Sequence, residues 1–190
     1  MEAARTLFLE RGYPATTMDA ISSAADVPPA TLYRLFPSKR DVLKTVVDIT
    51  AGGDDDPVAV HDRSEVRAIH DEHDPRRYLV EWAHMVRTLY DRITPIERML
   101  RSAAVVDADA ADMLATLKKQ RFSGQGAIVH GLVARKALRP GITAKEAHDV
   151  IYGLMSAELR TVLLEERRWS PKRYEAWLAD AMCDLLLPRR

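Results

Sequence analysis

The chain has little of several features that define protein classes. It contains one cysteine, Cys183, in 190 residues, so an internal disulfide and a zinc site of several thiolates are both excluded. No apolar run approaches the ~18 to 20 residues that a membrane helix needs. The first residues are not a basic leader followed by an apolar stretch. We therefore expect a soluble, cytoplasmic protein with no membrane partner.

Excess charge of either sign is also absent, because 28 lysines and arginines balance 28 aspartates and glutamates. Overall composition thus gives no sign of a nucleic-acid partner. Any argument for such a partner has to come from local groups of residues. The chain has only 8 glycines and 10 prolines, and 47% of its residues are apolar, which excludes disordered and fibrous classes. The length suits one sizeable core or two small ones.

A sheet pattern is missing as well, since apolar and polar residues nowhere alternate over a sustained stretch. Apolar positions recur with helical spacing along almost the whole chain, so the predicted fold is all-α. Gly12 is placed to end a first short helix. Thr16, with Asp19 three residues later, predicts the start of a second helix that runs to about Ala25.

Proline and serine mark the next two helix starts. Pro29 suits the first turn of a third helix, and Ser38 with Asp41 predicts the capped start of a fourth. The segment 51–76 is acidic and rich in helix breakers, so we expect a loop and a domain boundary there. The remaining predicted helices run from Pro75 to Ile93, from Pro95 to about Val106, from Ala110 to about Lys136, from Ala147 to Leu163, and from Pro171 to Leu185.

The second and third helices are separated only by Asp26, Val27 and Pro28, which predicts a helix-turn-helix unit. Its internal core is expected to contain Ile21, Ala25, Val27, Leu32 and Leu35, with the small Ser22 where the helices approach. Outward residues then face DNA. Thr17, Thr31, Tyr33 and Lys39 are candidate donors to phosphate, Pro29, Ala30 and Thr31 are candidates for base contacts, and Arg34 suits a guanine or a phosphate.

One combination of residues in this region is specific. Leu7-Phe8, Gly12-Tyr13, Thr16-Thr17, Ile21, Ala25, Val27, Thr31-Leu32-Tyr33, Phe36 and Lys39 together resemble the DNA-binding domain of the tetracycline-repressor (TetR) family, over roughly residues 3–47. Asp26 stands where that family usually has glycine, and aspartate tolerates a left-handed backbone better than most residues.

The resemblance implies a transcriptional regulator without enzymatic activity or cofactor, more often a repressor. Residues 1–50 would form the DNA-binding domain, with the motif at 17–36, and residues 51–190 a helical domain that binds a ligand and dimerises. The implied partners are a palindromic double-stranded DNA operator, a small-molecule effector and a second copy of the chain. The sequence gives no identity for the effector, the operator or the regulated genes.

Large apolar side chains on the later helices have two interpretations. They form the wall of an apolar effector cavity, or they fill an ordinary core, which is the commoner outcome for any single residue at helical spacing. The candidates for the cavity wall are Trp82, Met85, Tyr90, Met99, Phe122, Tyr152 and Met155.

The last two predicted helices are amphipathic and carry small residues that permit close approach. They pack either within one chain or against their symmetry mates in a four-helix interface. The family resemblance favours the dimer, because an operator with two DNA half-sites needs two DNA-binding domains, one from each chain. The interface candidates are Ile151, Leu154, Leu159, Val162, Trp177, Ala181 and Leu185.

Two alternatives remain open at this point. The first is a helical metal-binding protein or enzyme that uses His61, His70 and His73 in the acidic segment, although a solvated linker is the commoner role for such a segment. The second is a dimeric binding protein whose helix-turn-helix no longer recognises DNA. No metal site is assigned, because the histidines lie in an expected loop.

Overall fold

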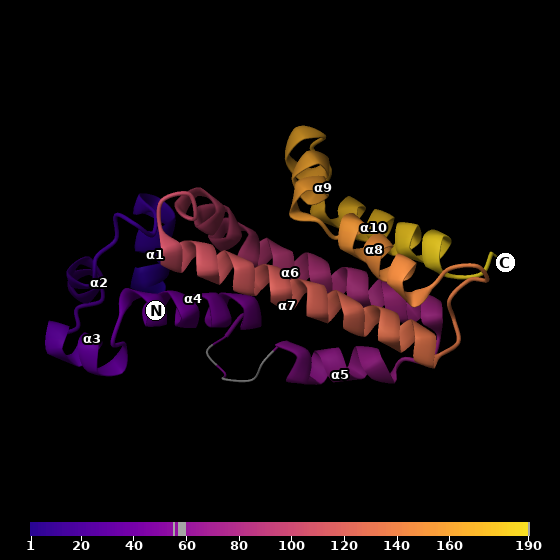
Figure 1. Cartoon of the computed structure of the whole chain (residues 1–190), viewed down its shortest axis with the longest axis horizontal. Coiled ribbons are helices and arrows are strands. Elements are labelled where there is room, and N and C mark those ends of the chain that lie inside the picture. The colour runs from indigo at the N-terminus through magenta and orange to yellow at the C-terminus, as the bar shows by residue number, and fades with distance from the viewer. Residues whose placement is uncertain (55, 57–59, 190) are drawn as a thin grey trace. The chain divides into compact units, whose positions relative to one another are not determined.

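The computed structural model describes residues 1–54, 56 and 60–189, and all regular secondary structure in these residues is helical (Figure 1). The predicted all-α class is therefore confirmed. Packing divides the chain into two compact units, of which unit 1 contains residues 1–59 and 91–119 and unit 2 contains residues 60–90 and 120–190. Two long helices, α6 (Pro75–Ala103) and α7 (Ala108–Ala134), contribute to both units.

Unit 1 begins with four helices whose ends follow local sequence signals. They are α1 (Glu2–Arg11), α2 (Met18–Ala24), α3 (Pro29–Leu35) and α4 (Lys39–Gly52). Gly12 ends α1 with a φ of 80°, a backbone angle that a residue without a Cβ adopts at little cost. Ser38 and Asp41 form the predicted capping box of α4. Local hydrogen bonding therefore fixes these ends before any long-range packing.

The start of α2 lies one residue later than predicted. Its N-cap is Thr17, whose hydroxyl accepts a hydrogen bond from the Ala20 amide at 3.1 Å. Thr16 is buried instead, and its hydroxyl donates to the carbonyls of Gly12 and Leu7. The prediction of Thr16 as the cap is wrong because two adjacent threonines carry the same local signal and packing chooses between them.

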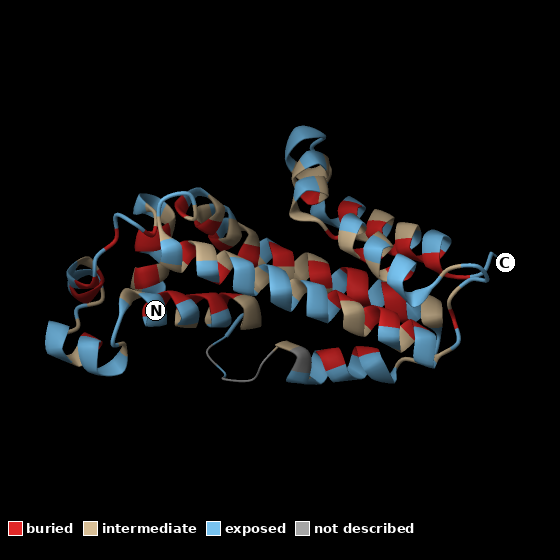
Figure 2. Ribbon diagram, in the orientation of Figure 1, coloured by how far each residue is buried: buried red, intermediate tan, exposed pale blue. Residues whose placement is uncertain are grey.

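The core of unit 1 joins residues far apart in the sequence. Phe8 and Val42 of the first helices are fully buried, as are Ile96 and Leu100 of α6 (Figure 2). Ala110 and Met113 of α7 are buried in the same unit. The helices α1 to α4 therefore fold together with the end of α6 and the start of α7.

Pro95 lies inside α6 and does not start a new helix. The prediction of a separate helix from Pro95 to Val106 is thus wrong. A proline in a helix interior removes one backbone hydrogen bond and crowds the preceding turn. Ile93, Ile96 and Leu100 continue one buried stripe past it, and this burial outweighs a single lost bond.

Unit 2 contains shorter helices around parts of α6 and α7. They are η1 (Val60–Asp62), α5 (Ser64–Asp71), α8 (Ala144–Leu154), α9 (Ala157–Thr161), the π-helical segment η2 (Val162–Glu166) and α10 (Pro171–Leu186). The expected loop in the acidic segment is partly wrong, because Val66 and Ile69 are buried one turn apart on α5. The predicted helix 147–163 is interrupted, since Ser156 caps a new helix at Ala157.

A close approach between α6 and α7 organises the interior of unit 2. Tyr78 is fully buried, and its hydroxyl donates to the Ile128 carbonyl at 3.1 Å. A Cβ at Gly131 would collide with that hydroxyl, so only glycine leaves the space. Arg135 lies over the Tyr78 ring at 4.2 Å and donates to the Glu72 carbonyl at 2.9 Å. These contacts tie the end of α5 to α7.

Candidate DNA-binding site and its anchor

The turn between α2 and α3 has the geometry of a helix-turn-helix. Asp26 adopts a φ of 51°, the left-handed conformation expected for it. Ser22 is buried, and its hydroxyl donates to the Val27 carbonyl at 2.5 Å while the Val27 amide donates back to the Ser22 carbonyl at 3.1 Å. Ile21 and Leu32 fill the space between the helices at 1% and 4% exposure. The crossing of α2 and α3 is therefore fixed by core and turn together.

The outer face of α3 is open to solvent. Pro29, Ala30, Tyr33 and Arg34 are exposed, and Thr31 is half-buried. Leu35 is 61% exposed, so its predicted place in the internal core is wrong, and the end of α3 presents an apolar side chain outward. A first turn of small apolar residues can contact thymine methyls, and Arg34 can reach a guanine edge or a phosphate. The face has the chemistry of a short reading helix.

The side chains of Thr17 and Lys39 both form hydrogen bonds within the protein. The Thr17 hydroxyl accepts from the Ala20 amide, which leaves its proton to donate outward. The Lys39 ammonium donates to the Tyr13 carbonyl at 2.9 Å and lies 4.2 Å from the centre of the Tyr13 ring. An ammonium has three donors, so one internal bond leaves others for a phosphate. Their contacts with DNA stay predictions.

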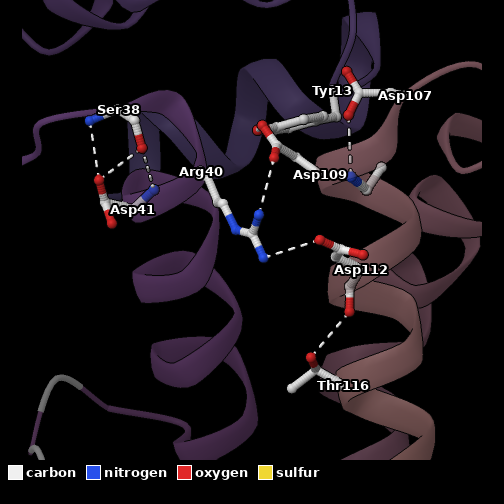
Figure 3. Close-up of polar contacts among 9 residues, drawn as sticks. Tyr13, Ser38, Arg40, Asp41, Asp107, Asp109, Asp112 and Thr116 are labelled. Atoms are coloured by element: carbon white, nitrogen blue, oxygen red, sulfur yellow. Dashed lines mark hydrogen bonds and ion pairs between the residues drawn. The ribbon is translucent and has the colours of Figure 1, made fainter.

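Acidic residues at the start of α7 hold α4 and the segment that follows α1 (Figure 3). Arg40 forms ion pairs with Asp109 and Asp112, each at 3.2 Å, and the Tyr13 hydroxyl donates to Asp109 at 3.3 Å. Asp107 caps α7 by accepting from the Ala110 amide at 3.0 Å. We call Tyr13, Arg40, Asp109 and Asp112 the Arg40 anchor.

The electrostatics of the Arg40 anchor favour a neutral tyrosine and charged acids. Burial, and then the negative charge of Asp109, raises the pKa of Tyr13 far above its usual range, so its hydroxyl remains a donor. The Arg40 side chain is about half exposed, and such exposed pairs contribute only ~0 to 1 kcal/mol each. The anchor therefore fixes orientation more than it adds stability. Sequence reasoning missed it because 69 residues separate Arg40 from Asp109.

A comparison with protein families decides the nature of this site. The family model described as bacterial regulatory proteins, tetR family, matches residues 1–46, which are α1 to α3 and the first half of α4. Over residues 1–46 the chain therefore resembles regulators of the tetR family. The chain thus contains the DNA-binding domain of a transcriptional regulator, and the resemblance seen in the sequence is confirmed.

Solved structures extend the likeness beyond the tetR domain. NalD, the secondary repressor of the MexAB-OprM multidrug efflux pump in Pseudomonas aeruginosa, has a TM-score of 0.68 and 20% identity over 98% of this chain and 93% of its own. FadR from Bacillus subtilis, in complex with stearoyl-CoA, has a TM-score of 0.72 and 15% identity over 97% and 96%. A search of curated protein sequences finds no match. At these identities the likeness shows a shared fold.

A third solved structure has a different ligand. A regulator from Saccharomonospora viridis in complex with choline has a TM-score of 0.69 and 19% identity, and covers 99% of this chain and 95% of its own. A thioester with a long acyl chain and a small quaternary cation are thus bound by proteins of one fold. The fold alone therefore does not define the effector of the present chain.

The structure separates the residues predicted to line an effector cavity. Tyr90 and Met155 are buried together in unit 2, where the tyrosine hydroxyl donates to the Met155 carbonyl at 2.9 Å. Phe122 is 55% exposed and lies 6.0 Å from Tyr152, ring centre to ring centre. Met99 belongs to unit 1. Trp82 is buried in unit 2 and Met85 is half-buried there.

Gln125 is a polar residue in the interior of unit 2 that sequence reasoning missed. It lies on α7 at 4% exposure, and neither its amide nitrogen nor its amide oxygen has a hydrogen-bond partner among the described residues. Leaving such a group unsatisfied costs about 1 to 3 kcal/mol. The buried Tyr174 hydroxyl also has no hydrogen-bond partner among the described residues, and burial raises the pKa of Tyr174 to about 12. Glutamine at a helical core position is the only signal that the sequence offered.

The predicted dimer residues differ in what they expose. Ile151 is fully buried within unit 2, so including it was wrong: its side chain has no surface to offer a partner. Val162 and Leu185 are 38% and 43% exposed. Leu154, Leu159, Trp177 and Ala181 are half-buried, and the interface through these six residues stays a prediction.

The histidines of the acidic segment are not gathered into a metal site in the described part of the chain. Within residues 1–54, 56 and 60–189 no three histidine, cysteine, aspartate or glutamate side chains are grouped to hold a metal ion. The His70 ring lies against the rings of Tyr78 and Trp82 at 6.2 and 5.5 Å. His73 is exposed, and the side chain of His61 lies outside the described residues. Across the described helices, none has the length and apolarity to span a membrane.

Proposed function

We propose that the chain is a homodimeric transcriptional repressor that is released from a palindromic DNA operator by a small-molecule effector. The observation that carries this proposal is the exposed outer face of α3, presented by a helix-turn-helix of the tetR family. Thr17, Pro29, Ala30, Thr31, Tyr33, Arg34 and Lys39 are the proposed DNA contacts. Because a repressor acts where bacterial DNA lies, we place it in the cytoplasm.

The effector half of the proposal depends on the interior of unit 2. Fold relatives include a named repressor and two proteins that hold small molecules. Buried polar groups without partners are unusual and need an explanation. Gln125 supplies one donor group and one acceptor at a buried position, so we infer that a polar group of the effector meets this amide. The homodimer supplies two reading heads for the two half-sites.

Selection of bound sequences from a random DNA pool tests the function. The purified chain, used at two salt concentrations, is expected to enrich a palindrome with half-sites about 34 to 36 Å apart, or a multiple of that distance. Arg34→Ala is expected to weaken operator binding by about 1 to 3 kcal/mol if it reads a guanine. Tyr33→Phe is expected to weaken binding as well, because it removes a phosphate donor.

Arg77→Ala is the matched control, because Arg77 is an exposed arginine on α6 in unit 2. Its operator affinity should equal that of the unaltered protein. If no sequence is enriched at low salt, or if Tyr33→Phe and Arg34→Ala bind DNA as well as the control, the DNA-binding proposal is wrong. The chain would then be a binding protein whose helix-turn-helix does not read DNA.

A further inference from the structure

Tyr13 contacts both a proposed DNA contact and the start of α7. Its side chain is fully buried, and its ring lies 5.3 Å from the Phe8 ring, centre to centre. The Lys39 ammonium lies 4.2 Å from the centre of the Tyr13 ring and donates to the Tyr13 carbonyl at 2.9 Å. At the far end of the ring, the Tyr13 hydroxyl donates to Asp109 at 3.3 Å. Tyr13 thus connects the Lys39 ammonium to α7.

Two consecutive residues of α4 hold the pair formed by Tyr13 and Asp109. Lys39 contacts Tyr13, whereas Arg40 pairs with Asp109 at 3.2 Å (Figure 3). Consecutive residues of a helix do not face each other, so α4 is attached to the pair at two separate points. The second contact of Arg40 is with Asp112. Lys39 uses one of its three ammonium donors on the Tyr13 carbonyl, which leaves the others for a phosphate.

A lysine that is already held in place binds a phosphate at lower cost. An unrestrained lysine side chain loses conformational freedom when it is ordered at an interface, and this loss lowers affinity. The Tyr13 carbonyl and ring face both attract the Lys39 ammonium, so part of this ordering precedes contact with DNA. The ring performs this role only while it is itself fixed, and the hydrogen bond to Asp109 fixes its hydroxyl end.

We propose that Tyr13 is a positioning residue for DNA binding: Asp109 fixes Tyr13, and Tyr13 holds the Lys39 ammonium where it meets a phosphate. This inference rests on the proposed DNA contact of Lys39. A buried tyrosine hydroxyl usually has some partner, and the positioning role follows from the additional contact of the same residue with Lys39 through both its carbonyl and its ring. The bond of 3.3 Å is longer than the ~2.5 to 3.0 Å usual between two oxygens, so the expected effect is modest.

A double-mutant cycle on operator binding tests the proposal. Lys39→Gln is expected to reduce the slope of log affinity against log salt concentration by about one, because one phosphate contact is lost. Asp109→Ala is expected to bind the operator about threefold more weakly than Asp112→Ala, because Lys39 is less ordered. Asp112→Ala is the matched control, since it removes the same charge and the other ion pair of Arg40. Combined with Lys39→Gln, the two alanine variants should bind equally.

A purely structural role of Asp109 predicts a different result. If Asp109→Ala disturbs the whole helix-turn-helix, its difference from Asp112→Ala persists when each is combined with Lys39→Gln, and the proposal is overturned. It is also overturned if the two alanine variants bind the operator equally on their own. An unchanged salt dependence in Lys39→Gln would overturn it too, because Lys39 would then make no phosphate contact.

A measurement without DNA separates this inference from the proposed function. In an NMR spectrum of the protein with isotope-labelled lysine, the signal that Lys39→Gln removes belongs to Lys39. The Tyr13 ring is expected to shift it upfield of the signal of Lys44, whose side chain is 69% exposed. Asp109→Ala should move the Lys39 signal toward that of Lys44, and Asp112→Ala should leave it in place.

The two measurements fail in different ways. A Lys39 signal that does not move in Asp109→Ala overturns the positioning role, even in a protein that binds its operator. A signal that moves as expected in a protein that selects no DNA sequence supports the coupling of Asp109 to Lys39 and contradicts the proposed function.

Discussion

Gln125 shows how a single buried side chain can relate stability to function. Its amide is removed from water, and neither of its polar atoms has a partner among the described residues. The folded protein therefore carries a cost of about 1 to 3 kcal/mol. In the proposed function, an effector that supplies both a donor and an acceptor would recover that cost on binding.

Replacing Gln125 with leucine is expected to raise the free energy of unfolding by about 1 kcal/mol, because the unsatisfied amide is removed. The same variant is expected to reduce the release of the operator by the effector. Urea denaturation and an operator-binding assay measure the two effects. Gln120→Leu, at an exposed position on the same helix, should change stability by less than about 0.5 kcal/mol. A destabilised Gln125→Leu protein would show that the amide is satisfied in solution.

Individual elements of the fold differ in how far their sequences determine them. The starts of α4 and α10 were predicted, at the Ser38 cap and at Pro171. In the structure Ser38 and Ser170 are the N-caps, and each accepts a hydrogen bond from the amide three residues later. Such signals are complete within a few residues of sequence. Pro95 shows the opposite case, since its local preference for a helix start is overridden by the buried stripe of α6.

Contacts between distant elements account for what the sequence did not reveal. The helix-turn-helix and its exposed face were predictable because a short turn of four residues, 25–28, joins α2 to α3. The Arg40 anchor and the buried, unpartnered amide of Gln125 depend on helices that meet only after folding. Helical spacing shows which residues lie on the apolar face of a helix, but it does not show which other helix packs against that face.

The contact between α6 and α10 predicts an acid-sensitive element. Arg87 donates to Glu175 at 2.8 Å, and His84 lies 3.1 Å from the same carboxylate. Burial by itself raises the pKa of Glu175, but the hydrogen bonds from Arg87 and His84 outweigh it and lower the pKa overall. Because the folded value lies below the unfolded value of about 4.3, this contribution to stability is present above that pH and is lost as the pH falls through the folded value.

Glu175→Gln is therefore expected to lower the free energy of unfolding by about 1 kcal/mol at pH 7. The difference from the unaltered protein should shrink as the pH falls from 7 toward 3, because the carboxylate becomes increasingly protonated as the pH approaches its folded pKa. Urea denaturation at both pH values measures it. Glu81→Gln, at an exposed position of α6, should show no difference at either pH. An equal loss in Glu175→Gln at pH 7 and pH 3 would mean that shape, and not charge, explains the effect.

At the scale of the whole molecule, the proposed operator requires two copies of the chain. Val162 and Leu185 are exposed apolar residues on the last helical segments, which are the segments predicted to form the dimer interface. Leu185→Glu places a charge in that surface, and burying an unpaired charge is costly. We expect this variant to dissociate at least about tenfold more readily and to lose operator affinity with it.

Sedimentation equilibrium over a range of concentrations measures the dissociation. Val105→Glu is the control, since Val105 lies between α6 and α7 in unit 1 and is 84% exposed; this variant should associate normally. If Leu185→Glu associates as strongly as Val105→Glu, the interface lies elsewhere on the molecule.

The discontinuity of unit 1 has a consequence for synthesis of the protein. The helices α1 to α4 leave the ribosome before the residues that complete their core and the Arg40 anchor, which lie beyond residue 91 and extend to Met113. Translation proceeds at about 5 to 20 residues per second. The nascent helices α1 to α4 therefore remain for several seconds without the parts of α6 and α7 that pack against them. During that interval Phe8 and Val42, fully buried in the finished unit, are available to chaperones. A growing chain is therefore expected to acquire operator affinity only after α7 has emerged.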